Sequence, residues 1–76
     1  MKKTRRVFGM GDRFREACNL SGKTYSQIIR ETGSTRSSFY RHLDGYQMET
    51  LALAKYCLAL NVSADWLLGI KEDPTR

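Results

Sequence analysis

The chain has few of the residues that mark secreted, metal-binding or catalytic proteins. Its 76 residues include two cysteines, Cys18 and Cys57, and a single histidine, His42. Two widely spaced cysteines do not make a disulfide framework, so we expect two reduced thiols buried as small apolar residues. The histidine has no second ligand at helical spacing, which argues against a metal site and predicts a half-buried packing residue. No cofactor is expected.

The sequence also lacks a long apolar run. Its longest apolar stretch, LALAKYCLAL, is interrupted by Lys55 and is far shorter than the roughly 20 residues that cross a bilayer. The basic N-terminal residues resemble the start of a signal peptide, but Asp12 and Arg13 follow before an apolar core of adequate length. We therefore expect a soluble, cytoplasmic protein that has no membrane partner.

Positive charge is in excess. Thirteen Lys and Arg oppose eight Asp and Glu, which gives a formal net charge of +5. Such an excess on one small domain favours a polyanionic partner. We divide the chain into a basic N-terminal arm at 1–9, one domain at 10–70 and a C-terminal tail at 71–76. The arm, which reads equally well as a frayed tail, carries Lys2, Lys3, Arg5 and Arg6.

Apolar periodicity and capping residues predict a compact, all-α bundle of five helices without strands. The expected helices span 11–20, 24–31, 35–43, 49–60 and 64–69. The expected N-caps are Asp12, Thr24, Ser34 and Ser63, and Gln27 is expected to complete a capping box with Thr24. The expected helix ends lie at Gly22, Gly33, Gly45 and Gly69.

The expected core follows from the same periodicity. In the first helix, Phe14, Ala17 and Leu20 are predicted to share the inward side, and Ile28 and Ile29 are predicted to face inward from the second. The fourth helix has an apolar repeat at i, i+3, i+4 and i+7, made by Leu53, Tyr56, Cys57 and Leu60.

The second and third helices are predicted to meet at a tight turn containing Gly33, as in helix–turn–helix proteins that place the second helix in the DNA major groove. The third helix has an inward stripe and a hydrogen-bonding outward face. The inward stripe consists of Phe39, His42 and Leu43. The outward face consists of Arg36, Ser37, Tyr40 and Arg41.

These side chains suit DNA. Arginine binds O6 and N7 of guanine with two hydrogen bonds, and serine reads several base edges. A tyrosine at position 40 stacks on a thymine methyl group or reaches a phosphate. Hydroxyl groups near the helix starts suit phosphate oxygens; they belong to Thr24, Thr35 and Ser38.

Two segments, TYSQIIRETGSTRSSFYRHLDG and LALNVSADWLLG, resemble the Cro/repressor-type (XRE-like) helix-turn-helix domain of phage and bacterial regulators. The resemblance covers about 13–69 and implies a lambda repressor-like fold with the third helix as recognition helix. It implies base contacts by Arg36, Ser37, Tyr40 and Arg41, and phosphate contacts by Tyr25, by Gly45, Tyr46 and Gln47 in the following loop, and by the basic arm.

The resemblance also implies a homodimer on a palindromic operator. The candidate dimer residues are Trp66, Leu67 and Ile70, although we favour a core position for Trp66 because a lone large aromatic usually anchors a small core. Thr32 and Ser34 depart from the family pattern, since they stand where valines are usual and make that corner of the core more polar. Lys23 stands where leucine is common.

We therefore expect a sequence-specific double-stranded DNA-binding transcriptional regulator, a repressor, and not an enzyme. The SGKT segment lacks the earlier glycine and the strand of a phosphate-binding loop, and one histidine beside Asp44 makes no triad. A protein-interaction module such as an antitoxin or adaptor is the alternative. An apolar patch around Tyr46, Met48 and Leu51 would favour it. RNA binding by charge alone is a third option, but the sequence lacks the interleaved stacking aromatic residues with which single-strand readers bind bases.

Overall fold

The structure is a computed structural model and describes residues 9–76, so the basic residues at positions 2, 3, 5 and 6 lie outside its description. Every regular element in this part of the chain is a helix, which confirms the all-α prediction. In chain order these are α1 (Met10–Ser21), α2 (Tyr25–Thr32), α3 (Arg36–Leu43), α4 (Thr50–Leu60) and α5 (Ala64–Leu67). No helix of residues 9–76 is long and apolar enough to span a membrane.

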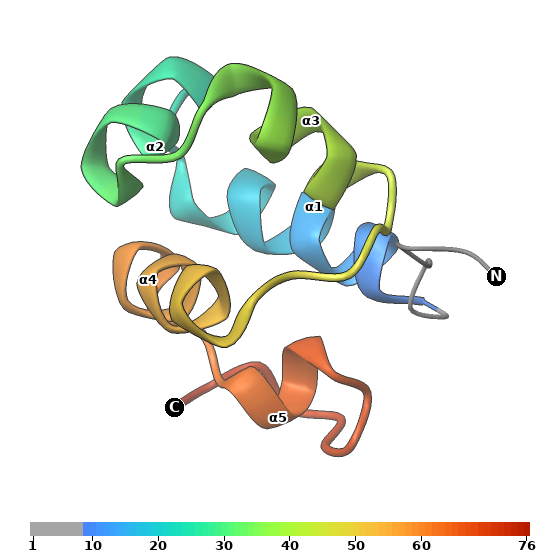
Figure 1. The fold of residues 1–76 in the computed structure, drawn as a ribbon. Helices are drawn as coiled ribbons and strands as arrows, with labels where there is room; N and C mark the ends of the chain where they lie inside the picture. Colours follow the sequence, from blue (N-terminus) through green and yellow to red (C-terminus); the bar gives the residue numbers. More distant parts are fainter. Residues whose placement is uncertain (1–8) are drawn as a thin grey trace, which may run out of the picture.

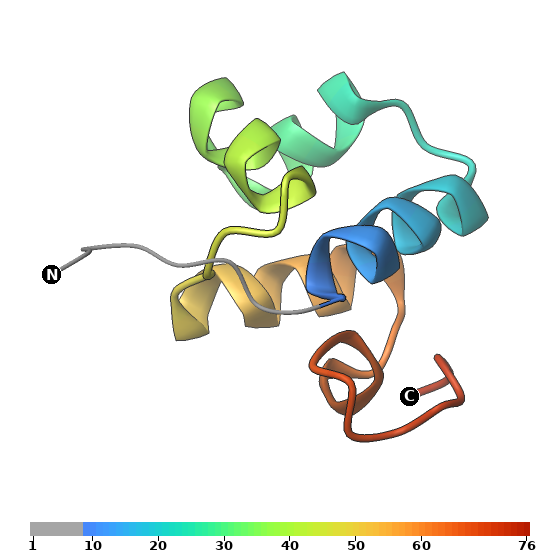
Figure 2. The ribbon, with the colours of Figure 1, turned by 90° about the vertical axis from the view of Figure 1, so that its right-hand side faces the viewer.

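Helix α1 is the central element. It packs against α3, α4 and α5, while α2 packs against α4 (Figure 1). The turned view shows α3 on one side of α1 and α5 on the other (Figure 2). The C-terminal tail folds back beside α5, where the Pro74 carbonyl accepts a hydrogen bond from the Ser63 backbone N–H at 2.8 Å.

The core is built around three aromatic rings from three helices. Phe14 of α1, Phe39 of α3 and Tyr56 of α4 are fully buried. The ring of Phe14 lies 5.6 Å from that of Phe39 and 4.6 Å from that of Tyr56, measured between centroids. These edge and tilted contacts are the geometries that aromatic pairs prefer. They fix α3 over α1 and α4.

One predicted core residue is wrong. Leu20 is 64% exposed, although Phe14 and Ala17 are buried as expected. Leu20 lies six positions after Phe14, and six steps of about 100° turn its side chain by about 240°, away from the core. Cys18, one turn after Phe14, takes the inward position instead and is buried as a free thiol, as is Cys57.

Two predicted caps are confirmed. The Thr24 hydroxyl oxygen accepts from the Gln27 backbone N–H at 3.1 Å, and the Ser63 hydroxyl oxygen accepts from two backbone N–H groups at the start of α5. The predicted capping box is only half formed, because the Gln27 side-chain amide donates to Glu31 at 3.1 Å rather than back to Thr24.

Two other predicted caps are wrong. Helix α1 begins at Met10 with Gly9 as its N-cap, so Asp12 lies in the first turn, where it pairs with Arg15 at 3.6 Å. Helix α3 is capped by Thr35, whose hydroxyl oxygen accepts from the Ser38 backbone N–H at 3.1 Å. Ser34 is half-buried instead, and its hydroxyl lies 3.1 Å from that of Tyr56.

Two glycines set the position of α3. Gly33 ends α2 with φ 71°, a left-handed conformation that lets the chain turn sharply into α3. Gly11 of α1 has no room for a side chain, because an added Cβ would lie 2.9 Å from the Leu43 carbonyl oxygen and 2.9 Å from the Gly45 nitrogen. The start of α1 thus meets the end of α3 backbone to backbone.

Lys23 has a role that explains its place in a turn. Its Nζ atom donates to a carboxylate oxygen of Glu31 at 2.7 Å and to the Ala59 carbonyl oxygen at 2.8 Å. One side chain therefore joins the α1–α2 turn to the end of α2 and the last turn of α4. A leucine at this position would join none of them by hydrogen bonds.

Candidate nucleic-acid interface

Helix α3 has two distinct faces, as predicted. Phe39 and Leu43 are buried against the core. The outward side chains are all exposed; we call them the reading face, and they are Arg36, Ser37, Tyr40 and Arg41. Their exposure on one helix is what base contact requires. Contact with bases itself stays a prediction.

The reading face is supported by an aromatic cluster that sequence reasoning did not identify. The Tyr25 ring, at the start of α2, lies 5.1 Å from Phe39 and 6.0 Å from Tyr40, in edge-to-face geometry. Tyr40 is 45% exposed and lies 5.7 Å from Phe39. The start of α2 and the middle of α3 are thereby joined through rings that are 14 and 15 residues apart in sequence. The only sequence signal is that positions 25, 39 and 40 are all aromatic.

The predicted phosphate-contacting hydroxyls lie near the helix starts. Thr24 and Thr35 are exposed N-caps, and each uses an oxygen lone pair to accept a backbone N–H. A hydroxyl that accepts in this way still carries its own proton, which it can donate to a phosphate oxygen. Ser38 is half-buried and lines the groove described below.

The loop after α3 is tied to that helix. The Arg41 guanidinium carbon lies 5.3 Å from the centre of the Tyr46 ring, within the range of a cation–π contact. Tyr46 is half-buried, Gln47 is exposed and Met48 is buried. The loop predicted to contact the DNA backbone is therefore held to the core by Met48 and to α3 by Arg41.

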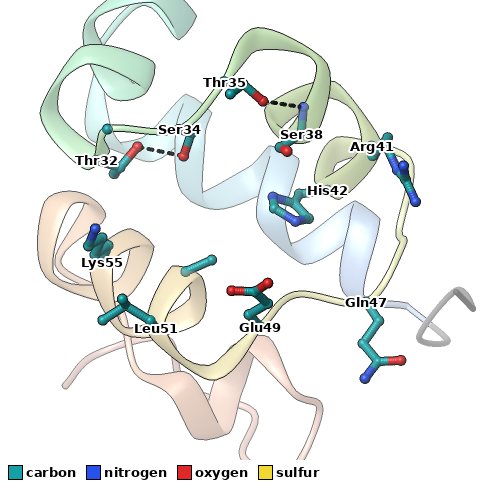
Figure 3. A pocket seen from close by; sticks show the side chains of 12 residues that line it. Thr32, Ser34, Thr35, Ser38, Arg41, His42, Gln47, Glu49, Leu51 and Lys55 are labelled. Atoms are coloured by element: carbon teal, nitrogen blue, oxygen red, sulfur yellow. Dashed lines mark hydrogen bonds between the residues drawn. The ribbon is translucent and has the colours of Figure 1, made fainter.

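Beneath the α2–α3 turn lies a chain of buried and half-buried polar groups, which we call the polar chain. The Thr32 hydroxyl donates to the Ile28 carbonyl oxygen at 2.8 Å and lies 2.9 Å from the Ser34 hydroxyl (Figure 3). The Ser34 hydroxyl lies 3.1 Å from that of Tyr56, which lies 2.9 Å from Nδ1 of His42. Among residues 9–76, no buried side-chain polar atom lacks a partner.

Burial controls the ionisation of this chain. Desolvation lowers the pKa of His42, the neighbouring Arg41 charge lowers it further, and Glu49 opposes the change. Burial also raises the pKa of Tyr56, although its hydrogen bond with Ser34 opposes this. His42 is therefore a neutral, half-buried packing residue at neutral pH, as the sequence predicted, and it is hydrogen-bonded as well.

A half-open groove of about 440 Å³ separates α3 from α4. Figure 3 shows His42 projecting from α3 and Glu49 from the start of α4 toward this groove. Its charged residues are Arg41, Lys55 and Glu49, so it carries both signs of charge. In residues 9–76, no three His, Cys, Asp or Glu residues come together as a metal site would require.

The predicted dimer residues need correction. Leu67 is fully buried and Trp66 nearly so, because both close the core from α5. Side chains used inside one chain are not available for a second copy, so they are wrong as dimer contacts; the core position favoured for Trp66 is confirmed. Ile70 is 73% exposed and stays a candidate.

Comparisons with known proteins give no relative. No model of a known protein family, no curated protein and no solved structure matches this chain. The resemblance to the Cro/repressor-type domain therefore stays a prediction from the residue pattern.

Proposed function

We propose that this chain is a cytoplasmic, sequence-specific double-stranded DNA-binding regulator, a repressor of the Cro type, with α3 as its recognition helix. One observation carries the proposal. A helix of eight residues, held by Phe39 and Leu43, directs two arginines, a serine and a tyrosine away from the core. A helix that served only the core would not need that face.

The dimensions of α3 suit the major groove. An α-helix with its side chains is about 10–12 Å across, and the major groove is about 12 Å wide. Arg36 is the first residue of α3 and Tyr40 lies one turn later, so the reading face spans the first two turns of the helix. In helix–turn–helix proteins, the N-terminal residues of the recognition helix reach base edges.

Phosphate contact is supported by the helix starts. Thr24 and Tyr25 lie at the beginning of α2, and Thr35 at the beginning of α3. Unpaired backbone N–H groups and the helix dipole make such ends favourable for anions. A formal net charge of +5 adds long-range attraction to a polyanion.

Specific recognition would use two copies of the chain. A single recognition helix covers only a few base pairs, whereas a symmetric dimer reads two half-sites about 34 Å apart. Because Trp66 and Leu67 are buried, the exposed apolar residues that follow α5 are the ones left for this contact. They are Leu68 and Ile70.

The first experiment is selection from a random duplex library at two salt concentrations. We expect a palindromic motif with half-sites one helical turn apart. Arg36→Ala should weaken binding to that motif by about 1–3 kcal/mol and relax the preference at one base pair. Arg30→Ala is the matched control, because it removes the same charge from an exposed position outside the reading face. Recovery of no motif, or equal effects of both variants, would refute the proposal.

A protein partner is the second candidate function, and one observation favours it. The predicted patch around Tyr46, Met48 and Leu51 does not form, because Met48 is buried. Leu51 and Leu58 of α4, however, are 62% and 64% exposed and lie two turns apart on one side of that helix. If they contact a partner, Leu58→Glu should abolish its capture and leave DNA binding unchanged.

A further inference from the structure

The polar chain contains more hydrogen bonds than its hydroxyls can supply. Besides a longer contact of the Thr32 hydroxyl with the Ile29 carbonyl oxygen at 3.4 Å, its four contacts join the Ile28 carbonyl, three hydroxyl groups and one imidazole nitrogen. Each hydroxyl has one proton to donate, so the three hydroxyls account for three of the four bonds. For all four contacts to be hydrogen bonds, the fourth proton must come from His42.

The direction follows step by step from the fixed end. A carbonyl oxygen only accepts, so the Thr32 proton is committed to Ile28. The Thr32–Ser34 contact then needs the Ser34 proton, and the Ser34–Tyr56 contact needs the Tyr56 proton. The Tyr56 oxygen is left to accept from Nδ1–H of His42.

The opposite direction is unfavourable. If Tyr56 donated to His42, Ser34 would donate to Tyr56, and the single Thr32 proton would have to serve either the Ser34 oxygen or the Ile28 carbonyl, so one of the four bonds would be lost. The hydroxyl oxygens of Thr32 and Ser34 lie 2.9 Å apart, and Thr32 is buried. The reverse direction therefore makes three hydrogen bonds where the direction from His42 makes four.

We infer that the polar chain runs in one direction, from His42 to the Ile28 carbonyl, and that Tyr56 and His42 are positioning residues for α3. The neutral imidazole then carries its proton on Nδ1, whereas an unconstrained imidazole prefers Nε2. Charged groups on the same groove are Arg41 of α3, Glu49 at the α4 N-cap and Lys55 of α4. None of them takes part in the four hydrogen bonds of the polar chain.

The polar chain positions α3 because it joins four parts of the fold. Thr32 belongs to α2, Ser34 to the turn, Tyr56 to α4 and His42 to the last turn of α3. Apolar packing alone tolerates small rotations of a helix, but directional hydrogen bonds at the turn and at the far end of α3 resist them. The consequence for DNA reading depends on the proposed function; the direction of the chain does not.

The direction of the polar chain is tested by nitrogen NMR of the His42 imidazole. The signal is unambiguous because the protein has one histidine. Long-range proton–nitrogen correlations of the neutral ring should show the proton on Nδ1. Thr32→Val removes the hydroxyl that fixes the direction of the polar chain. The hydroxyls of Ser34 and Tyr56 can then donate in the opposite direction, and the imidazole proton should move to Nε2. Thr50→Val, the same change at an exposed position of α4, should leave it on Nδ1.

Tyr56→Phe gives a second measurement if Thr32→Val does not fold. It removes the acceptor of Nδ1–H, so the ring should again revert to the Nε2 form. A wild-type protein with its neutral proton on Nε2 would overturn the inference. So would a ring that stays in the Nδ1 form in both folded variants.

The positioning role is tested with the operator from the library selection. Tyr56→Phe should lower the ratio of specific to random-duplex affinity roughly tenfold, while Thr50→Val leaves that ratio unchanged. An unchanged ratio in folded Tyr56→Phe would refute the positioning role even if the tautomer is as inferred. If wild type shows no sequence preference, the proposed function fails and the positioning role with it, and the tautomer still decides the direction of the chain.

Discussion

Replacing Gly11 by alanine should destabilise the protein, although glycine-to-alanine changes in helices usually stabilise. The added Cβ would meet the Leu43 carbonyl oxygen and the Gly45 nitrogen at 2.9 Å, and the Gly45 Cα at 3.0 Å. All three are backbone atoms, so no side chain can rotate out of the way. Helix α1 and the end of α3 must therefore separate by several tenths of an ångström.

Two effects of opposite sign decide the magnitude for Gly11→Ala. The better helix propensity of alanine contributes up to about 1 kcal/mol of stability, and less at Gly11 because it lies in the first turn. Overpacking of a well-packed contact costs roughly 1–3 kcal/mol. We expect a net loss of about 1–2 kcal/mol, which lowers the Tm of a domain this size by roughly 4–16 °C.

The assay is urea denaturation followed by circular dichroism, together with backbone NMR shifts at Leu43–Gly45. Gly22→Ala is the comparison, because it strains a φ of 72° but its Cβ meets no atom within 4 Å. Both variants should lose stability, and only Gly11→Ala should shift the end of α3. A Gly11→Ala protein as stable as wild type, or more stable, would refute the backbone contact between these helices.

Three further predictions concern titration, thiol reactivity and salt. Because burial holds the folded pKa of His42 below its ordinary 6.5, the unfolded chain binds the proton more readily. Stability should therefore fall as pH drops from about 6.5 through the folded pKa, and urea midpoints of His42→Phe should show a shallower fall in that window. Cys18 is 2% exposed, and burial raises its pKa to about 11, so Ellman's reagent should label it only as fast as the protein opens; rapid labelling in native buffer would contradict this. If a dimer neutralises about ten phosphates, log K against log salt should have a slope of about −9, and a slope near −2 would exclude DNA as the main partner.

Much of the fold could be predicted because its signals are local. The repeat in α4, the turn at Gly33 and the two faces of α3 depend on spacing within one helix, and all three appear in the structure. Leu20 was misplaced although the same rule applies there, because a spacing of six residues does not return to the face of Phe14.

Other predictions that are wrong concern residues whose position is set by contacts with residues far away in the sequence. Ser34 and Thr35 are adjacent hydroxyl residues, and each alone is a good N-cap. Tyr56, 22 residues later, hydrogen-bonds Ser34 and leaves the cap to Thr35. Leu67 is core rather than dimer contact for a similar reason, since α1 and α4 pack against α5. No pattern along the chain contains that information.

Trp66 gives α5 an optical signal of its own. This single tryptophan is buried in α5, which packs on α1 and α4, while Tyr25, Phe39 and Tyr40 cluster between α2 and α3. Tryptophan emission thus reports whether α5 stays docked, whereas the four tyrosines, at positions 25, 40, 46 and 56, report on α2, α3, the loop after α3 and α4 together. Two optical signals from the unlabelled protein can therefore distinguish the detachment of α5 from the opening of the rest of the fold.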